Sequence, residues 1–415
     1  MVRLLRVVFL CALVSCLALP ALAQPKGAPP PDAEGWIPLF DGQSLAGWQL
    51  RDKNGPNGWS AKDGVLSNTA PSTDLVTEMT FTDHELHVEF RLPRGGNSGV
   101  YLQGRYEVQV ADSAGKPTSK YMCGAIYDKI APSKNAAKPA GQWQTLDIKF
   151  IAPRADRQGN VVQKARITVT LNGVTVIDNA EIDGVTGGAL DNNEGKPGPL
   201  MLQGNHTSVD YRNIKYRPLR VGWPDDKLFT PLFDGKTLTG WSVRGPAHGG
   251  KGRWEVRDGA IVGTQDPPGI GGVLMTEKKF GDFEIRCEIN PDWGIDSGLF
   301  LRTTDQGACY QCTVDYRPGG QVGTLYGERS GGWLQQNPLW EKFYWPGRWN
   351  ELRCVVRGQP PHIQIWLNGN LTVDFWDTKE RLPAEGYIGL QVHRGHDWQG
   401  RLTRFRNIRI LPLGK

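Results

Sequence analysis

Long apolar runs are missing from this sequence after its first two dozen residues. A helix that crosses a bilayer needs about 18 to 20 apolar residues in succession. We therefore expect no transmembrane segment in the remainder of the chain.

Clusters of basic residues are missing as well. The 415 residues include 48 lysines and arginines against 43 acidic residues, and the formal net charge is only +5. Proteins that bind nucleic acid usually carry a concentrated basic patch. We expect no nucleic-acid partner.

Cysteine is scarce, and its spacing gives little support for a metal site. Five cysteines follow the N-terminal segment: Cys123, Cys287, Cys309, Cys312 and Cys354. Cys309 and Cys312 form a C-x-x-C pair, but a zinc site of this type normally has a second pair. We interpret the cysteines as packing or disulfide residues, with room for one or two bridges in the second half. No other spacing supports a metal ligand set, so no cofactor is expected.

The first 23 residues have the pattern of a secretory signal peptide. Arg3 and Arg6 precede an apolar run, and Ala21-Leu22-Ala23 provides a small-x-small cleavage site. Lipid anchoring at Cys16 ranks second, because cleavage there would leave the apolar LALPALA at the new terminus. We expect export to the periplasm or the extracellular space, with a proline-rich spacer over 24–35.

Patterns of long amphipathic helices are nearly absent, and short alternating segments take their place. ARITVTLNGVTVID (165–178) alternates apolar and polar residues on both sides of Asn172-Gly173, and HIQIWLNGNLTVDF (362–375) repeats this device. Asn-Gly supplies the positive φ angles of a tight hairpin turn. An all-β protein whose sheets pack face to face is predicted.

The chain repeats itself at a distance near 200 residues. LFDG with a following GW occurs at 39–48 and again at 232–241, NSG at 97–99 matches DSG at 296–298, and RNI at 212–214 matches RNI at 406–408. This period suits one β-sandwich domain. We predict a first domain over 36–219, a linker over 220–228 and a second domain over 229–415.

The stretch GNSGVYLQGRYEVQVAD (96–112) carries the strongest functional signal. Its alternation places Tyr101, Gln103 and Arg105 on one side of a strand, and Glu107 shares a side with Gln109. Plain exposure to solvent would explain any one of these residues. The presence of an acid, amides, a tyrosine and an arginine on one strand instead favours a binding or catalytic site. Glu85, His87, Glu89 and Arg91 share a side in the same way, on DHELHVEFR.

Two acids near the end of this stretch suggest a rival chemistry. A retaining glycosidase needs two carboxyl groups about 5 Å apart, and jelly-roll glucanases that resemble family sixteen glycoside hydrolases carry them as E-x-D-x-E or E-x-D-x-x-E. Here the run is Glu107-x-Gln109-x-x-Asp112, so the central aspartate is an amide. The aligned run of the second copy, Gln311-x-Thr313-x-Asp315, lacks the leading glutamate.

The second copy is rich in aromatic residues, which suit a groove for sugar rings. It holds ten of the 15 tryptophans, and GERSGGWLQQNPLWEKFYW (327–345) has no aromatic counterpart in the first copy. The segment is either a packed loop or a binding loop. The candidate substrate-binding residues of this copy are Arg302, Asp315, Trp333 and His393.

Several motifs together resemble the 3-keto-disaccharide hydrolase domain family, long catalogued as a domain of unknown function. They are NSGVYLQGRYEVQVADS, CGAIY, WQTLDIKFIAPR and LQGNHTSVDYRNI in the first copy. The more diverged second copy keeps LFDGKTLTGW, DSGLFLR, GTLYG and FRNI. The resemblance covers nearly the whole chain after the leader, and it implies two tandem concanavalin A-like jelly rolls.

The resemblance also implies cleavage of glycosides that carry a ketone at C3. A base removes the proton at C2, the C1 substituent leaves, and water adds afterwards. We take Glu107 or His206 as the base, and Asn97, Tyr101, Gln103, Gln109 and Gln203 as binding residues, while Arg105 would face a developing oxyanion. A divalent metal could polarise the ketone, but no spacing in the sequence supports one.

Two alternatives stay open. Both copies could bind glycans without cleaving them, or Glu107 and Asp112 could act as a retaining pair. Among these readings we favour an exported enzyme acting on carbohydrate, with catalysis in the first copy and binding in the second.

Overall fold

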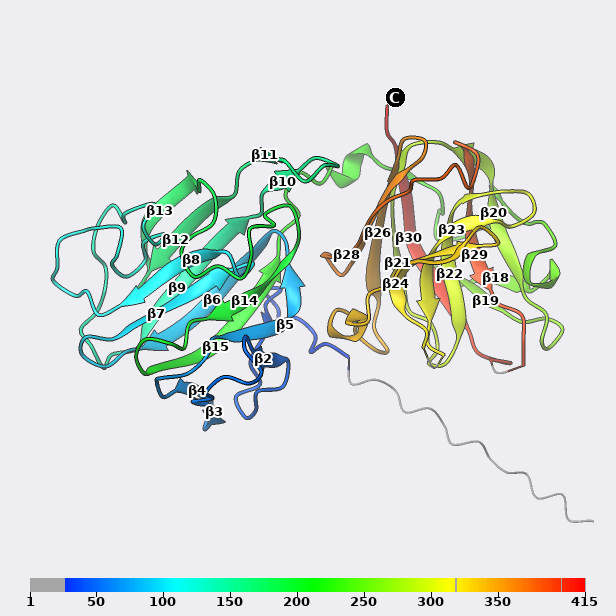
Figure 1. Ribbon diagram of the computed structural model, residues 1–415. Helices are drawn as coiled ribbons and strands as arrows, with labels where there is room; N and C mark the ends of the chain where they lie inside the picture. The colour runs from blue at the N-terminus through cyan, green and yellow to red at the C-terminus, as the bar shows by residue number, and fades with distance from the viewer. Residues whose placement is uncertain (1–26, 318, 397, 415) are drawn as a thin grey trace, which may run out of the picture.

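The computed structural model describes residues 27–317, 319–396 and 398–414. Within them it contains thirty strands and three short 3-10 helices: η1 (Asp226–Leu228), η2 (Ala247–Gly249) and η3 (Trp340–Lys342). The strands form two β-sandwiches that lie next to each other and are joined through η1 (Figure 1). The all-β prediction of two tandem jelly rolls is confirmed. The expected signal peptide and Cys16 lie outside the described residues.

The first sandwich consists of a five-stranded sheet, called here its front sheet, and a larger back sheet. The front sheet has the order β2 (Trp48–Leu50), β5 (Leu75–Phe81), β14 (Gly198–Leu202), β7 (Asn97–Leu102), β8 (Tyr106–Ala111). The back sheet has the order β13 (Val174–Glu181), β12 (Arg166–Leu171), β9 (Gln144–Ile151), β6 (His84–Arg91), β15 (Val209–Pro218), β4 (Val65–Asn68), β3 (Trp59–Lys62), and β1 (Ile37–Pro38) pairs with β15. A small ribbon joins β10 (Arg154–Ala155) to β11 (Val161–Gln163).

The second sandwich repeats this plan with a larger front sheet. That sheet has the order β17 (Trp241–Val243), β20 (Gly272–Phe280), β29 (Gly386–Val392), β22 (Asp296–Thr303), β23 (Cys309–Asp315), β24 (Val322–Glu328), β25 (Gly332–Gln335). Its back sheet has the order β18 (Arg253–Arg257), β19 (Ala260–Thr264), β30 (Thr403–Pro412), β21 (Phe283–Ile289), β26 (Asn350–Arg357), β27 (His362–Leu367), β28 (Asn370–Trp376), and β16 (Thr230–Pro231) pairs with β30.

The hairpins explain why these sequences fold locally as strands. Asn172 and Gly173 have φ angles of 54° and 79°, and Asn368 and Gly369 have 51° and 83°. These are the positive values that a two-residue hairpin turn requires, so both Asn-Gly turns are confirmed. The apolar side chains of the alternating strands then fill the space between the two sheets, where Val100, Leu102 and Val108 are completely buried.

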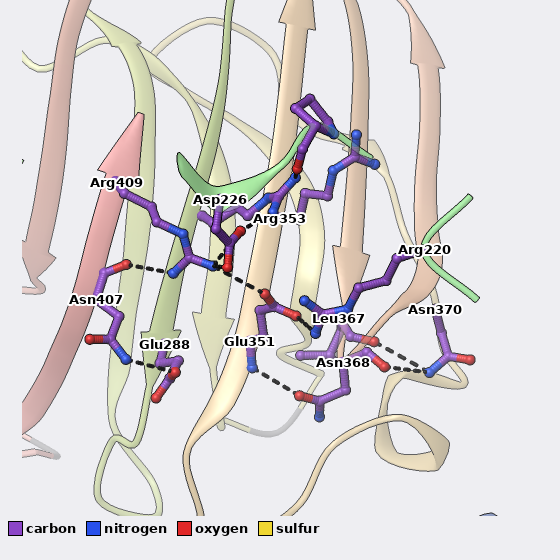
Figure 2. A network of polar contacts seen from close by, with 12 residues as sticks. Arg220, Asp226, Glu288, Glu351, Arg353, Leu367, Asn368, Asn370, Asn407 and Arg409 are labelled. Atoms are coloured by element: carbon purple, nitrogen blue, oxygen red, sulfur yellow. Dashed lines mark hydrogen bonds and ion pairs between the residues drawn. The ribbon is translucent and has the colours of Figure 1, made fainter. Parts of the chain in front are cut away.

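The linker is fastened to the back sheet of the second sandwich. Figure 2 shows the polar network in which Arg220 reaches Glu351, at 2.5 Å between Nη2 and Oε2, while Asp226 lies 3.3 Å from Arg409. The buried Arg286 also pairs with Asp226 and donates to the carbonyl oxygen of Pro224. These contacts hold the linker against the second domain along most of its length.

The two sandwiches also touch each other directly. The Tyr216 hydroxyl lies 3.3 Å from Asn370 Oδ1, and Lys342 Nζ lies 3.2 Å from Glu78 Oε2. A cleft of about 530 Å³ lies between the domains, and Gln103, Arg154, Trp223, His362 and Trp376 are among its lining residues.

Within the described residues, no helix is long and apolar enough to cross a membrane.

The cysteines between residues 27 and 414 form no disulfide. All five described cysteines are buried free thiols, so the bridges considered from the sequence are not present. Cys309 and Cys312 lie on β23 and belong to separate apolar clusters, because a spacing of three residues on a strand places side chains on opposite faces. They therefore pack against different neighbours and cannot act as a zinc pair.

One serine in each copy ties the two sheets together behind the site. The Ser98 hydroxyl donates to the carbonyl oxygen of Gln203 at 2.8 Å and lies 2.8 Å from the Tyr211 hydroxyl of the back sheet. In the second copy Ser297 bonds in the same way to the Gln391 carbonyl oxygen and to Thr403. The serine of the NSG and DSG motifs is thus a structural residue.

Ser98→Ala should lower the free energy of unfolding by about 1 to 3 kcal/mol, because two buried polar groups lose their partner. Calorimetric unfolding of the full chain would measure this. Ser208→Ala, at an exposed position, is the matched control and should change stability by less than about 0.5 kcal/mol. Equal stability of the two variants would show that the Ser98 contacts contribute nothing.

Candidate functional site

The candidate site lies on the face of the first front sheet that points away from the core. Strands β7 and β8 pair in regular register, with Tyr101 opposite Glu107, Gly99 opposite Gln109 and Asn97 opposite Ala111. Directly paired residues share a face, so Tyr101, Glu107, Gln109 and Asn97 lie together. The prediction that Glu107 and Gln109 share a side is confirmed.

Gln103 and Arg105 do not extend this polar face, which corrects the expectation from alternation. Strand β7 ends at Leu102, and Gln103 has a φ angle of 52° in the turn that leads to β8. Gln103 donates to the carbonyl oxygen of Phe81, and Arg105 binds Asp191 and the carbonyl oxygen of Lys196. Arg105 therefore anchors a loop, and its guanidinium is not directed at a substrate oxyanion.

Glu107 has the geometry of a poised base. Its side chain is 2% exposed, and the Tyr101 hydroxyl donates to Oε2 at 2.7 Å. Oε1 has no hydrogen-bond partner among the described residues. The carboxyl lies against Gly99, where an added Cβ would come within 2.3 Å of Oε1. Only glycine permits this close approach.

Burial raises the pKa of Glu107 from 4.5 to about 7. The hydrogen bond from Tyr101 opposes the shift, and the nearby negative charge of Asp74 adds to it. A carboxylate with a pKa near neutrality is a stronger base than an ordinary glutamate and is still ionised in part at pH 7. Desolvation of a carboxyl beside a second acid is thus the physical origin of its basicity.

Three amide side chains surround this carboxyl. Gln109 Nε2 donates to Asn97 Oδ1 at 2.8 Å, and Gln203 Nε2 donates to the Tyr101 hydroxyl at 3.3 Å. The Oε1 atoms of Gln109 and Gln203 are buried without a hydrogen-bond partner in the described structure. Unpaired buried carbonyl oxygens are costly, so both atoms are suited to accept hydroxyl groups from a ligand.

A segment over 183–197 covers one side of the site, and no pattern in the sequence predicts it. The Tyr101 hydroxyl lies 2.9 Å from the Gly187 carbonyl oxygen, the Thr186 hydroxyl accepts from the Glu107 backbone N–H, and Leu190 packs on Tyr101. Arg51 joins this segment to the site, because it binds Asp74 and the carbonyl oxygen of Gly188. Asp74 and Arg51 are functional candidates that local pattern could not identify.

His206 and Asp112 lie away from this centre. His206 is exposed in the loop between β14 and β15, next to Thr207, which bonds to Asn97. Ala111 is the last residue of β8. Asp112 follows it and accepts a hydrogen bond from the Gly95 N–H.

The second polar row of the first copy belongs to the back sheet, so it does not contribute to the site. Its members form a ladder of ion pairs and charged hydrogen bonds across neighbouring strands. The pairs are Glu85 with Arg217, His87 with Asp147, Glu89 with Arg212 and Arg91 with Asp210. These four residues are explained by cross-strand pairing.

The second copy contributes a different set of side chains. Asp315 and His393 both lie near Asp296 on the outward face of the front sheet, and Trp333 is 39% exposed on β25. Arg302 does not join them. It is buried with a φ angle of 50°, and it binds Asp282 and the carbonyl oxygens of Gly281 and Gly358.

Neither a metal cluster nor the large cleft coincides with Glu107. No group of three or more histidine, cysteine or acidic side chains in the described ranges is arranged to hold a metal ion. The cleft between the domains includes Gln103 but not Glu107 among its lining residues. We place the candidate active site at Glu107, because among the residues that the structure describes only there do a basic carboxyl and unpaired amide oxygens meet.

A family model described as the 3-keto-alpha-glucoside-1,2-lyase-like domain matches residues 35–217 and again 228–411. The chain belongs to this family. Its two lyase-like domains are the two sandwiches, and the resemblance noted from the sequence motifs is confirmed.

This lyase-like chain is similar in part to a curated protein. It is 28% identical, over 155 residues, to the 3-keto-disaccharide hydrolase of Bacteroides thetaiotaomicron, covering 29% of this chain and 53% of that protein. The chain thus spans about half the length of the curated relative that it matches.

Two solved structures show similarity over one domain. A protein of Parabacteroides distasonis, provisionally named a glycosyl hydrolase, is 31% identical with a TM-score of 0.41, covering 49% of this chain and 95% of that one. The carbohydrate-binding module CBM66 of Bacillus subtilis is 16% identical with a TM-score of 0.27, covering 42% of this chain and 96% of the module.

Replacing Glu107 by glutamine should change the free energy of unfolding of the first lyase-like domain in a pH-dependent way. Compared with the wild type, Glu107→Gln should be relatively more stable at pH 8 than at pH 5. The pKa of Glu107 is raised in the folded state, so its stabilising contribution is complete below about pH 4.5 and is lost as the pH rises through 7. The difference in free energy of unfolding between the variant and the wild type should change by about 3 kcal/mol between pH 5 and pH 8. Chemical denaturation at both pH values measures it, and a difference that does not vary with pH would contradict the raised pKa.

Proposed function

We propose that the first domain cleaves glycosides whose sugar carries a ketone at C3, with Glu107 as the base. The observation that supports this most strongly is the buried Glu107 carboxyl, with Oε2 held by Tyr101, Oε1 unpaired and a pKa of about 7. The family and the curated relative point to the same substrate class.

The reaction uses the acidity that the ketone gives to the neighbouring carbon. Glu107 Oε1 takes the proton from C2, and the electron pair of that C–H bond forms an enolate with the C3 carbonyl. The enolate then expels the C1 oxygen, which leaves with a proton as an alcohol, and an unsaturated keto sugar remains. Addition of water to this product at C1 completes hydrolysis. No carboxylate has to attack the sugar in this reaction.

The surrounding amides would hold the sugar for this step. Gln109 and Gln203 each present an unpaired amide oxygen for hydroxyl groups. Asn97 Oδ1 accepts from Gln109, so the Asn97 amide nitrogen is free to donate to the enolate oxygen as charge develops. Tyr101 holds the Glu107 carboxyl in place. Once Glu107 has taken the proton from C2, it is the acid that can give this proton to the leaving C1 oxygen.

The first test compares matched 3-keto and unmodified disaccharides, incubated with the full chain with and without a chelator and followed by mass spectrometry. We expect cleavage of the keto form alone, with loss of turnover by at least about a hundredfold in Glu107→Gln. Cleavage of both forms would favour an ordinary glycosidase. Cleavage of neither by the folded protein would favour a domain that only binds glycans.

Gly99→Ala should also abolish most turnover, because the new methyl group would push the Glu107 carboxyl away from its position. The matched control is Gly298→Ala in the second domain, where the added Cβ would meet Gln311 at 2.4 Å. Turnover of the 3-keto substrate should stay near the wild-type value in that control. Equal loss in both variants would mean that cleavage is not assigned to the first domain.

A further inference from the structure

The second domain keeps the backbone of the site but has no acid at the positions of Glu107 and Asp74. Gly298, Phe300 and Gln311 occupy the register positions of Gly99, Tyr101 and Glu107, since Phe300 pairs with Gln311 as Tyr101 pairs with Glu107. In the same way Val273 takes the place of Asp74, because Leu274 pairs with Leu390 as Leu75 pairs with Leu202. A carboxyl base, its hydroxyl partner and the neighbouring acid are all replaced by neutral groups.

Hydrogen-bonded polar side chains nevertheless cover the outward face of this front sheet. Gln311, Gln391 and His248 form this polar floor. Gln311 Nε2 donates to Gln391 Oε1 at 3.0 Å, and Gln391 Nε2 lies 2.9 Å from His248 Nε2. His248 is 6% exposed, and burial followed by the nearby His393 lowers its pKa to about 3, so the ring is neutral and accepts this hydrogen bond. Glu328 lies at the margin, 3.8 Å from His248.

Charged side chains at the other end of the floor balance one another. Arg317 lies 2.7 Å from Asp296 and 2.9 Å from Asp315, and His393 lies 3.5 Å from Asp296. Arg329 lies 4.0 Å from Glu328. No strong net charge therefore faces a ligand, which favours a neutral one over an acidic or a basic one.

Aromatic rings border this floor on the side of β24 and β25. Tyr326 pairs with Gln311 on β23 and with Trp333 on β25, so all three side chains share the outward face. The rings of Tyr326 and Trp333 are 5.3 Å apart at 83°, and Trp333 is 39% exposed. An exposed indole beside amides and carboxylates fits a sugar, whose C–H face packs on the ring while its hydroxyls bind the polar groups.

We propose that this face of the second domain binds a neutral oligosaccharide and does not cleave it. The site is distinct from the one at Glu107, so the proposal goes beyond the activity assigned to the first domain. Trp333 would carry a sugar ring, and Gln311, Gln391 and Asp296 would bind its hydroxyl groups. A protein with both sites holds a glycan in one domain while the other domain acts on keto sugars.

Isothermal titration of the full chain with a set of neutral oligosaccharides tests this directly. The probes are hexaoses of α-1,4-, β-1,4- and β-1,3-linked glucose, of β-1,4-linked xylose and of β-1,4-linked mannose. We expect at least one to bind with a Kd of about 1 mM or tighter, and Trp333→Ala to weaken it about tenfold. Trp376→Ala removes a ring that is 41% exposed outside this face, and it should bind like wild type.

A further pair of variants separates this site from the catalytic one. Glu107→Gln should bind the oligosaccharide with unchanged affinity, while Trp333→Ala should cleave a soluble 3-keto-disaccharide at the wild-type rate. Absence of binding for all five probes, or equal affinity in Trp333→Ala and wild type, would overturn the proposal. Neither result would affect the assignment of cleavage to Glu107, which depends on turnover alone.

Discussion

The close approach of a carboxyl group to a backbone without a side chain is the constraint on which the site depends. Glu107 crosses over Gly99, and Tyr101 holds it there from the facing strand. Because the carboxyl lies flat against the sheet, it is removed from water and its pKa rises. A larger residue at position 99 would move the carboxyl outward, where water would restore an ordinary pKa. The contact with Gly99 therefore determines both the position of the Glu107 carboxyl and its raised pKa.

The two domains show how the same backbone can carry different chemistry. Ser98 and Ser297 join the sheets in the same manner, and Gln203 and Gln391 occupy equivalent positions. What differs is the outward face, where the second copy has neutral side chains in place of the acids and adds β24 and β25 at the edge of the sheet. The extra strands carry Trp333 and Tyr326. The fold is thus conserved between the copies by its core, while the outward face is free to diverge.

Local pattern was sufficient for the fold and for the position of Glu107. Alternation has a period of two along each strand, so it shows which residues share a face, and the repeated landmarks show two domains. It failed where the backbone turned: Gln103 and Arg302 have positive φ angles, and the side chains of such residues do not follow the alternation of the strand. It also could not find Asp74, Thr186 or His248, since their contacts join residues about 80 to 140 positions apart. The alternating row from Glu85 to Arg91 was read correctly as one face, but only pairing showed that this face belongs to the other sheet.

The covering segment is linked to the base through a single phenolic hydrogen. Tyr101 has one O–H, yet two acceptors lie within reach, Glu107 Oε2 at 2.7 Å and the Gly187 carbonyl oxygen at 2.9 Å. While Glu107 is ionised, the hydrogen is drawn to the carboxylate, because hydrogen bonds to charged acceptors are the stronger ones. When Oε1 has accepted a proton, the carboxyl is neutral and Oε2 becomes a weaker acceptor, so the Gly187 carbonyl oxygen competes better for the hydrogen of Tyr101. The segment over 183–197 is then held more firmly after proton transfer than before it, so the protonation state of the base and the closure of the site are thermodynamically coupled.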